Sequence, residues 1–174
     1  MITRLFFIIG TKVLSFMSEM GEILLMFVRS MAEQIIAQVQ PKDYLSEILA
    51  ICYWVTEHVH YVSDPAHVEL IKDPQRHLEE TAARGQSIGD CDDIACLIAA
   101  LCLVIGRIVE FVVVGFGEAG QYSHVFARVK EPRSEQWLVF DPVAGTDPRG
   151  MLDRVTTFYT VSCDEFPGAV RSIT

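Results

Sequence analysis

The feature that most constrains the fold is the apolar run over residues 94–105. Apolar residues occupy every side of a helical wheel drawn over this run, and Gly106 follows it where a helix cap is expected. A helix without a polar face has to be buried on all sides. We therefore expect a central helix around which the other elements of the chain pack.

Helix-like segments precede this run, and strand-like segments follow it. Apolar spacings of three and four predict an amphipathic helix over 11–38, a second helix from Pro41 to about His60 and a short helix from Pro74 to Arg84, with the rest of 61–89 irregular. Alternating apolar residues predict three strands over 108–115, 122–130 and 136–141, joined as an antiparallel meander, and a fourth strand over 155–161. Helices followed by strands indicate an α+β fold.

Length and apolar runs limit the domain count and the location. The 174 residues suit one domain, 1–174, in which residues 1–40 form an N-terminal amphipathic helical extension. Charged residues interrupt the apolar runs of 1–31, so we expect no membrane span. No small-residue cleavage site follows these runs, so we expect a cytoplasmic protein without a signal peptide.

The net charge of −9 bears on binding partners. Nucleic-acid binding depends on clustered Lys and Arg, so this charge argues against it. The charge serves solubility or the recognition of a basic partner. The methionine-rich helix over 11–38 either packs on its own domain or binds a protein partner.

One of the five cysteines stands apart from the others. The set fits neither a disulfide framework nor zinc-ligand spacing. We expect reduced thiols, with Cys52, Cys96 and Cys102 as buried apolar side chains and Cys163 unassigned. Cys91 falls between Gly89 and the first turn of the central helix. Unpaired N–H groups there lower a thiol pKa and can hold an oxyanion, so Cys91 is a candidate nucleophile.

A thiol nucleophile needs a base and a group that orients the base. His124 shares a face of its predicted strand with Phe126 and Arg128, and Asp141 ends the next strand. If the two strands pair through the turn over 131–135, His124 and Asp141 are cross-strand neighbours. A hydrogen-bonded structural histidine and a strand-ending aspartate remain the alternatives.

A glycine motif nearby invites a different interpretation. Residues 115–120 have the GxGxxG spacing of a dinucleotide-binding loop. That motif must open a helix, whereas residues 122–129 alternate with a period of two. We therefore interpret the segment as a glycine-rich hairpin.

Three motifs in order resemble a known family. They are Gly89-Asp90-Cys91-Asp92-Asp93 before the apolar helix, Ser123-His124-Val125-Phe126-Ala127-Arg128-Val129, and Trp137-Leu138-Val139-Phe140-Asp141-Pro142. Together with Tyr61-Val62-Ser63-Asp64, they resemble the transglutaminase-like superfamily, which shares a papain-like cysteine-protease fold. The resemblance implies N-terminal helices and a buried nucleophile helix packed on an antiparallel sheet. It implies Cys91 as nucleophile, His124 as base and Asp141 as the orienting acid.

The resemblance also bears on function. It implies thiol-dependent acyl transfer or amide hydrolysis, and we favour a cysteine peptidase that acts on a peptide or protein without a cofactor. A protein-crosslinking transglutaminase is one alternative. A non-catalytic module of a bacterial or phage assembly, docking through the 11–38 helix, is another. The compact form resembles bacterial and phage members, so a virion-associated location is the second option, while residues 1–40 match no pattern of the family.

Two features near Cys91 stay open. Gln86 is the candidate for a second oxyanion donor, with a solvated loop glutamine as the alternative. Asp90, Asp92 and Asp93 suit a helix N-terminus, but carboxylates beside Cys91 oppose thiolate formation. We expect some of them to turn away and cap backbone N–H groups. A metal site on these aspartates is the alternative, although no correctly spaced oxygen-ligand loop is visible.

Overall fold

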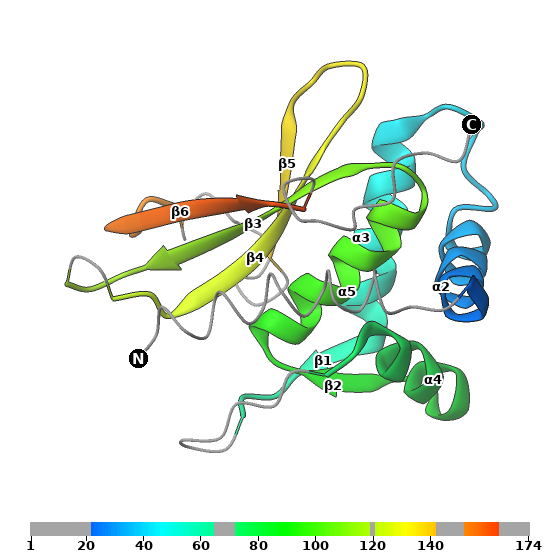
Figure 1. The fold of residues 1–174 in the computed structure, drawn as a ribbon, viewed down its shortest axis with the longest axis horizontal. Helices are drawn as coiled ribbons and strands as arrows, with labels where there is room; N and C mark the ends of the chain where they lie inside the picture. The colour runs from blue at the N-terminus through cyan, green and yellow to red at the C-terminus, as the bar shows by residue number, and fades with distance from the viewer. Residues whose placement is uncertain (1–21, 65–71, 119–120, 142–151, 164–174) are drawn as a thin grey trace.

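A central helix organises the fold. The computed structural model describes residues 22–64, 72–118, 121–141 and 152–163. Helix α5 (Cys91–Val104) lies between the other helices and an antiparallel sheet (Figure 1). Every residue from Asp92 to Cys102 is buried, which confirms the predicted central helix. Gly106 follows with a φ of 77°, a left-handed conformation that suits glycine at a helix end.

Within the described ranges, three further helices pack against α5 on the side away from the four-stranded sheet. They are α2 (Glu22–Ile35), α3 (Tyr44–His58) and α4 (Pro74–Arg84). The prediction is confirmed for α4, which begins at the Asp73 cap and ends at left-handed Gly85. Helix α3 begins at Tyr44 rather than at the predicted Pro41. The side chain of Asp43 accepts the N–H of Ser46 and so caps the first turn of the helix at this point. None of the helices in the described ranges is long and apolar enough to cross a membrane.

Helix α2 covers part of the predicted 11–38 helix, and residues 11–21 lie outside the described residues. Its Val28 and Ala32 are fully buried in the core shared with α5. This face therefore packs on its own domain, whereas Met26 is 69% exposed. Binding of a partner through this helix stays a prediction.

The antiparallel sheet contains β3 (Ile108–Gly115), β4 (His124–Lys130), β5 (Trp137–Phe140) and β6 (Thr157–Ser162). Its strand order is β5-β4-β3-β6, with every neighbouring pair antiparallel. The meander predicted for the first three strands is therefore confirmed, with strand ends that differ by at most two residues. The fourth strand, β6, lies at the opposite edge of the sheet from β5, beside β3. The pairing of Val114 with His124 makes the connection after Gly115 a hairpin. Strand β4 follows the glycine motif where a dinucleotide-binding loop would open a helix, so the interpretation as a hairpin is confirmed.

The two faces of β4 carry different side chains, as its alternation predicts. Val125, Ala127 and Val129 belong to the main core with α5, while Phe126 packs with other residues on the opposite face. Burial of each such apolar side chain contributes roughly 1.5–3 kcal/mol. This packing fixes β4 against the helix that begins with Cys91.

A second, two-stranded sheet contradicts the sequence prediction. Strands β1 (Val59–Tyr61) and β2 (Ser87–Gly89) pair in parallel, in a region predicted to be the end of a helix and an irregular loop. Three-residue strands are too short to show an alternating pattern, and β1 follows α3 without a turn. The consequence is functional, because β2 leads the chain directly into Asp90 and Cys91.

Candidate active site

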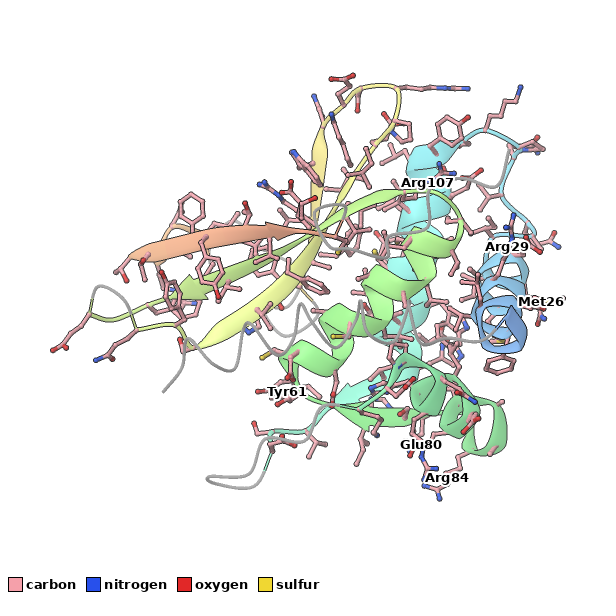
Figure 2. The ribbon with its side chains drawn as sticks, viewed as in Figure 1. Met26, Arg29, Tyr61, Glu80, Arg84 and Arg107 are labelled. Atoms are coloured by element: carbon pink, nitrogen blue, oxygen red, sulfur yellow. The ribbon has the colours of Figure 1, made fainter. Side chains whose placement is uncertain are left out.

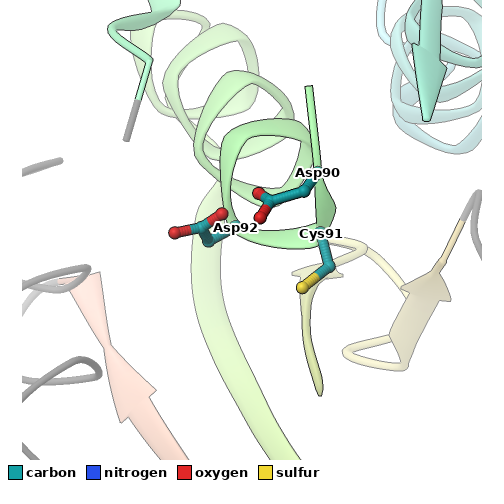
Figure 3. Close-up of side chains that lie close together, drawn as sticks. All are labelled: Asp90, Cys91 and Asp92. Carbon is teal, nitrogen blue, oxygen red and sulfur yellow. The ribbon is translucent and has the colours of Figure 1, made fainter. Parts of the chain in front are cut away.

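The thiol of Cys91 lies at the first residue of α5 (Figure 3). All five cysteines are free thiols, and Cys91 alone among them is partly exposed. Cys52, Cys96 and Cys102 are buried, which confirms their prediction, and Cys163 is buried as well. Access to a reagent or substrate therefore distinguishes Cys91 from the other four.

The environment of Cys91 favours the neutral thiol at rest. The pKa of the Cys91 thiol is raised to about 12. Burial is the largest cause, the nearby Asp90 and Asp92 also raise the pKa, and the backbone N–H of Val125 lowers it. Burial and nearby carboxylates both disfavour a thiolate. A thiol with this pKa needs a base to act as a nucleophile at neutral pH.

His124 and Asp141 form a hydrogen-bonded pair. Nε2 of His124 lies 2.5 Å from Oδ2 of Asp141, and the two side chains are only 11% and 1% exposed. An ionised carboxylate can only accept a hydrogen bond, so Nε2 of His124 carries the proton in the neutral ring. Nδ1 is then the nitrogen with a lone pair, as a proton acceptor requires.

Strand register explains why this pair forms. Ala127 lies opposite Phe140, and continuing the pairing by one residue places Asp141 opposite Phe126. His124 is two residues before Phe126 on the same face, so His124 and Asp141 are diagonal neighbours. The predicted proximity of His124 and Asp141 is thus confirmed. The residue directly opposite Asp141 is Phe126, two residues after His124.

Cys91 lies against the same part of the sheet. The backbone N–H of Val125, the residue after His124, lowers the pKa of Cys91, so this group lies close to the sulfur. Cys91 and Asp141 also line one small cavity, together with residues of α5, β4 and β5. The fold therefore places Cys91 and Asp141 at one cavity, with His124 bonded to Asp141, and the catalytic roles of the three residues stay a prediction.

The carboxylates at the start of α5 are largely engaged with backbone N–H groups. Asp93 accepts from the N–H of Lys72 at 2.5 Å and from that of Asp90 at 3.3 Å, and Asp92 accepts from the N–H of Asp93 at 3.0 Å. Burial and the neighbouring carboxyl of Asp90 raise the pKa of Asp92 well above its usual range. Asp92 therefore keeps a proton at neutral pH, which reduces the negative charge beside the thiol.

The alternative of a metal site has a geometric basis here. Among the described residues, Asp90, Cys91 and Asp92 offer ligand atoms that lie within 4.8 Å of one another (Figure 3). A metal would require deprotonated ligands, but the pKa values of Cys91 and Asp92 are both raised. A cation bound here would therefore have to displace the protons of Cys91 and Asp92, which lowers its affinity.

Gln86 takes part in a different contact. Its Oε1 lies 3.0 Å from Nε2 of His60, and its side chain is exposed beside the β1–β2 sheet. The role of Gln86 as an oxyanion donor stays a prediction. The sequence did not predict that the backbone N–H of Val125 lowers the pKa of Cys91, because every residue type except proline carries such a group.

Comparisons with known proteins identify the family and the fold of the chain. The model of the transglutaminase-like superfamily matches residues 29–142, which include all three candidate residues. The expectation that residues 1–40 match no pattern of the family is therefore wrong for residues 29–40. No curated protein sequence matches the chain significantly.

Two solved structures share the fold. One is a putative cysteine protease from Cytophaga hutchinsonii, with a TM-score of 0.56 and 18% identity over 79% of this chain and 43% of the other. A putative protease from Parabacteroides distasonis has a TM-score of 0.55 and 13% identity over 88% of this chain and 29% of the other. The chain thus spans less than half the length of either neighbour. With a family match over most of its length, the chain belongs to the transglutaminase-like superfamily.

Proposed function

We propose that the chain catalyses thiol-dependent acyl transfer and acts as a cysteine peptidase. The observation that carries this proposal is the His124–Asp141 pair, whose Asp141 lines a small cavity together with Cys91, the one partly exposed thiol, at a helix N-terminus. Membership of the transglutaminase-like superfamily and a fold shared with two putative proteases support it.

In the first step, Nδ1 of His124 takes the proton of the Cys91 thiol while the sulfur attacks an amide carbonyl. The sulfur–carbon bond forms, and the carbonyl electrons move to the oxygen. The N–H of Cys91 at the start of α5 is placed to stabilise this oxyanion. Because the pKa of Cys91 is about 12, proton transfer has to accompany the attack.

In the second step, the amide C–N bond breaks and the imidazolium of His124 gives its proton to the departing amine. A thioester on Cys91 remains. Water then attacks the thioester with His124 again as base, and this releases a carboxylic acid and restores the thiol. Asp141 holds the Nε2–H tautomer of His124 throughout and stabilises the imidazolium.

The acceptor of the acyl group separates a peptidase from a transglutaminase. Incubation with a library of quenched fluorescent peptides, with and without an excess of a primary amine, tests both by mass spectrometry. We expect cleaved peptides with free carboxylates, and no cleavage by the Cys91→Ser variant. Amine adducts in place of carboxylates would identify a transglutaminase, and a wild-type chain that produces neither product would contradict the enzyme proposal.

A further inference from the structure

A polar network lies behind the turn that carries Cys91. Glu80 of α4 lies beside β2 (Figure 2), and its Oε2 accepts from Nζ of Lys72 and from the hydroxyl of Ser87, each at 2.9 Å. Nζ of Lys72 also donates to the carbonyl of Ile88 at 2.5 Å. One lysine ammonium thus joins α4 to the last residues of β2.

The backbone of the same lysine reaches the nucleophile helix. The N–H of Lys72 donates to Oδ1 of Asp93 at 2.5 Å, while Oδ2 of Asp93 accepts the N–H of Asp90. Lys72 therefore contacts both sides of the turn Gly89–Asp90, through Ile88 before it and Asp93 after it. Cys91 is the next residue of the chain.

Close packing leaves this turn little room to move. A Cβ added to Gly89 would lie 2.8 Å from Asp93 and from the ring of His77. These two side chains therefore fill the space beside Gly89, and a larger residue would not fit there. Nδ1 of His77 in turn bonds with the Ser87 hydroxyl at 2.8 Å. The turn is held by packing from α4 and α5 and by hydrogen bonds from Lys72.

Two cations bind the same carboxylate, and this provides an internal control. Arg76 pairs with Oε1 of Glu80 at 3.1 Å, but its side chain is 64% exposed and it lies on the same helix as Glu80. The side chain of Lys72 is 22% exposed and bonds to a different element. The two ion pairs are therefore similar in chemistry and different in what they connect.

We propose that Lys72, held by Glu80, is a positioning residue that fixes the turn before Cys91 and so aligns the thiol with His124. This inference rests on the proposed function of Cys91. Lys72 does not touch the reacting atoms and acts through Ile88 and Asp93. A hydrogen bond from the Lys72 ammonium lowers the pKa of Glu80 to about 2, so the Glu80 carboxylate stays ionised at neutral pH.

The test measures how fast iodoacetamide alkylates Cys91 between pH 6 and 9, resolved by peptide mass spectrometry, in Lys72→Met, Lys72→Arg and Arg76→Met. Misplacement of a reacting group by about 1 Å can cost about 100-fold, so we expect Lys72→Met to react about 10- to 100-fold more slowly than wild type. Lys72→Arg keeps a cation and should recover to within about threefold. Arg76→Met should stay within about twofold, because exposed ion pairs contribute little.

Circular dichroism and melting temperature establish that each variant is folded. If Lys72→Met does not fold, Glu80→Gln, which keeps the shape and removes the charge, should show the same slowing. If folded Lys72→Met, or Glu80→Gln in its place, is alkylated at Cys91 as fast as Arg76→Met or faster, the positioning role of Lys72 is overturned. His124→Ala, measured beside them, tests the proposed function separately, because an unchanged rate in that variant counts against the base and not against Lys72.

Discussion

Two enclosed histidines in this fold have opposite surroundings. His124 bonds to the carboxylate of Asp141 and keeps a small exposed fraction, whereas His77 is fully buried and bonds to the hydroxyl of Ser87. The Ser87 hydroxyl donates its proton to Glu80, so Nδ1 of His77 must donate to Ser87, and its Nε2 has no partner among the described residues. The partner decides the role: a carboxylate can stabilise an imidazolium, and a buried hydroxyl stabilises it far less.

The pKa of His77 agrees with this difference. The pKa of His77 is lowered to about 4, mainly by burial and in addition by the nearby Lys72 ammonium. His77 is therefore neutral at physiological pH and acts as a structural residue of the network behind Cys91. His124 is the histidine suited to proton transfer, and the following predictions test this division.

The largest effect should separate the two histidines in catalysis. His124→Ala should lower the rate of peptide hydrolysis about 1000- to 10,000-fold, because the base and the acid of the reaction are both lost. His77→Ala should lower the rate per folded molecule less than about tenfold. Steady-state rates with a cleaved library peptide measure both, and similar losses in the two variants would erase the distinction.

Asp141→Asn tests the carboxylate partner of His124. Asn keeps the size of the side chain but cannot stabilise an imidazolium, so the rate should fall about 100- to 1000-fold. The melting temperature serves as the control and should change little in comparison. A rate within threefold of wild type would show that Asp141 only ends its strand.

Stability should show the reverse order of the two histidines. His77→Ala removes a fully buried side chain, so it should lower the free energy of unfolding by about 2–4 kcal/mol. His124→Ala should cost less than about 2 kcal/mol, because the ring lies at the start of β4 and keeps some exposure. Urea unfolding measures both, and a larger loss in the His124 variant would contradict the structural role of His77.

The pH dependence of stability should sharpen the same contrast. The folded pKa of His77 is about 4 against 6.5 for a free histidine, so protons bind the unfolded chain first as pH falls. Its contribution is fully present above pH 6.5 and is lost toward pH 4, by about 3 kcal/mol in all. His77→Gln should lose less stability over this range than wild type in parallel urea titrations. Identical pH profiles would mean that His77 binds its proton equally well in both states.

Much of the fold follows from patterns in the sequence. The fully apolar run predicts the central helix, Asp73-Pro74 and Gly85 delimit α4, and the alternation in β4 places its residues on the correct faces. These predictions succeed because each depends on local chemistry. Turn length between β4 and β5 also suffices to bring His124 near Asp141.

Other parts depend on contacts between distant segments. Strands β1 and β2 exist because Val59 meets Ser87 across the intervening chain, and three residues carry no periodic signal. The network of His77, Ser87, Glu80 and Lys72 is equally hidden, since polar residues of a helix and a loop suggest solvent rather than burial. Gln86 is the nearest upstream amide in the sequence, yet the structure pairs it with His60.

The central claim is that Cys91 is a nucleophile that depends on His124. Site-resolved alkylation of all five cysteines in the native protein tests it most directly, with wild type compared with His124→Ala. We predict that Cys91 reacts at least about tenfold faster than Cys52 or Cys163 in wild type and loses this advantage in the variant. Reaction of Cys91 no faster than the buried thiols, or an unchanged rate without His124, would contradict the account.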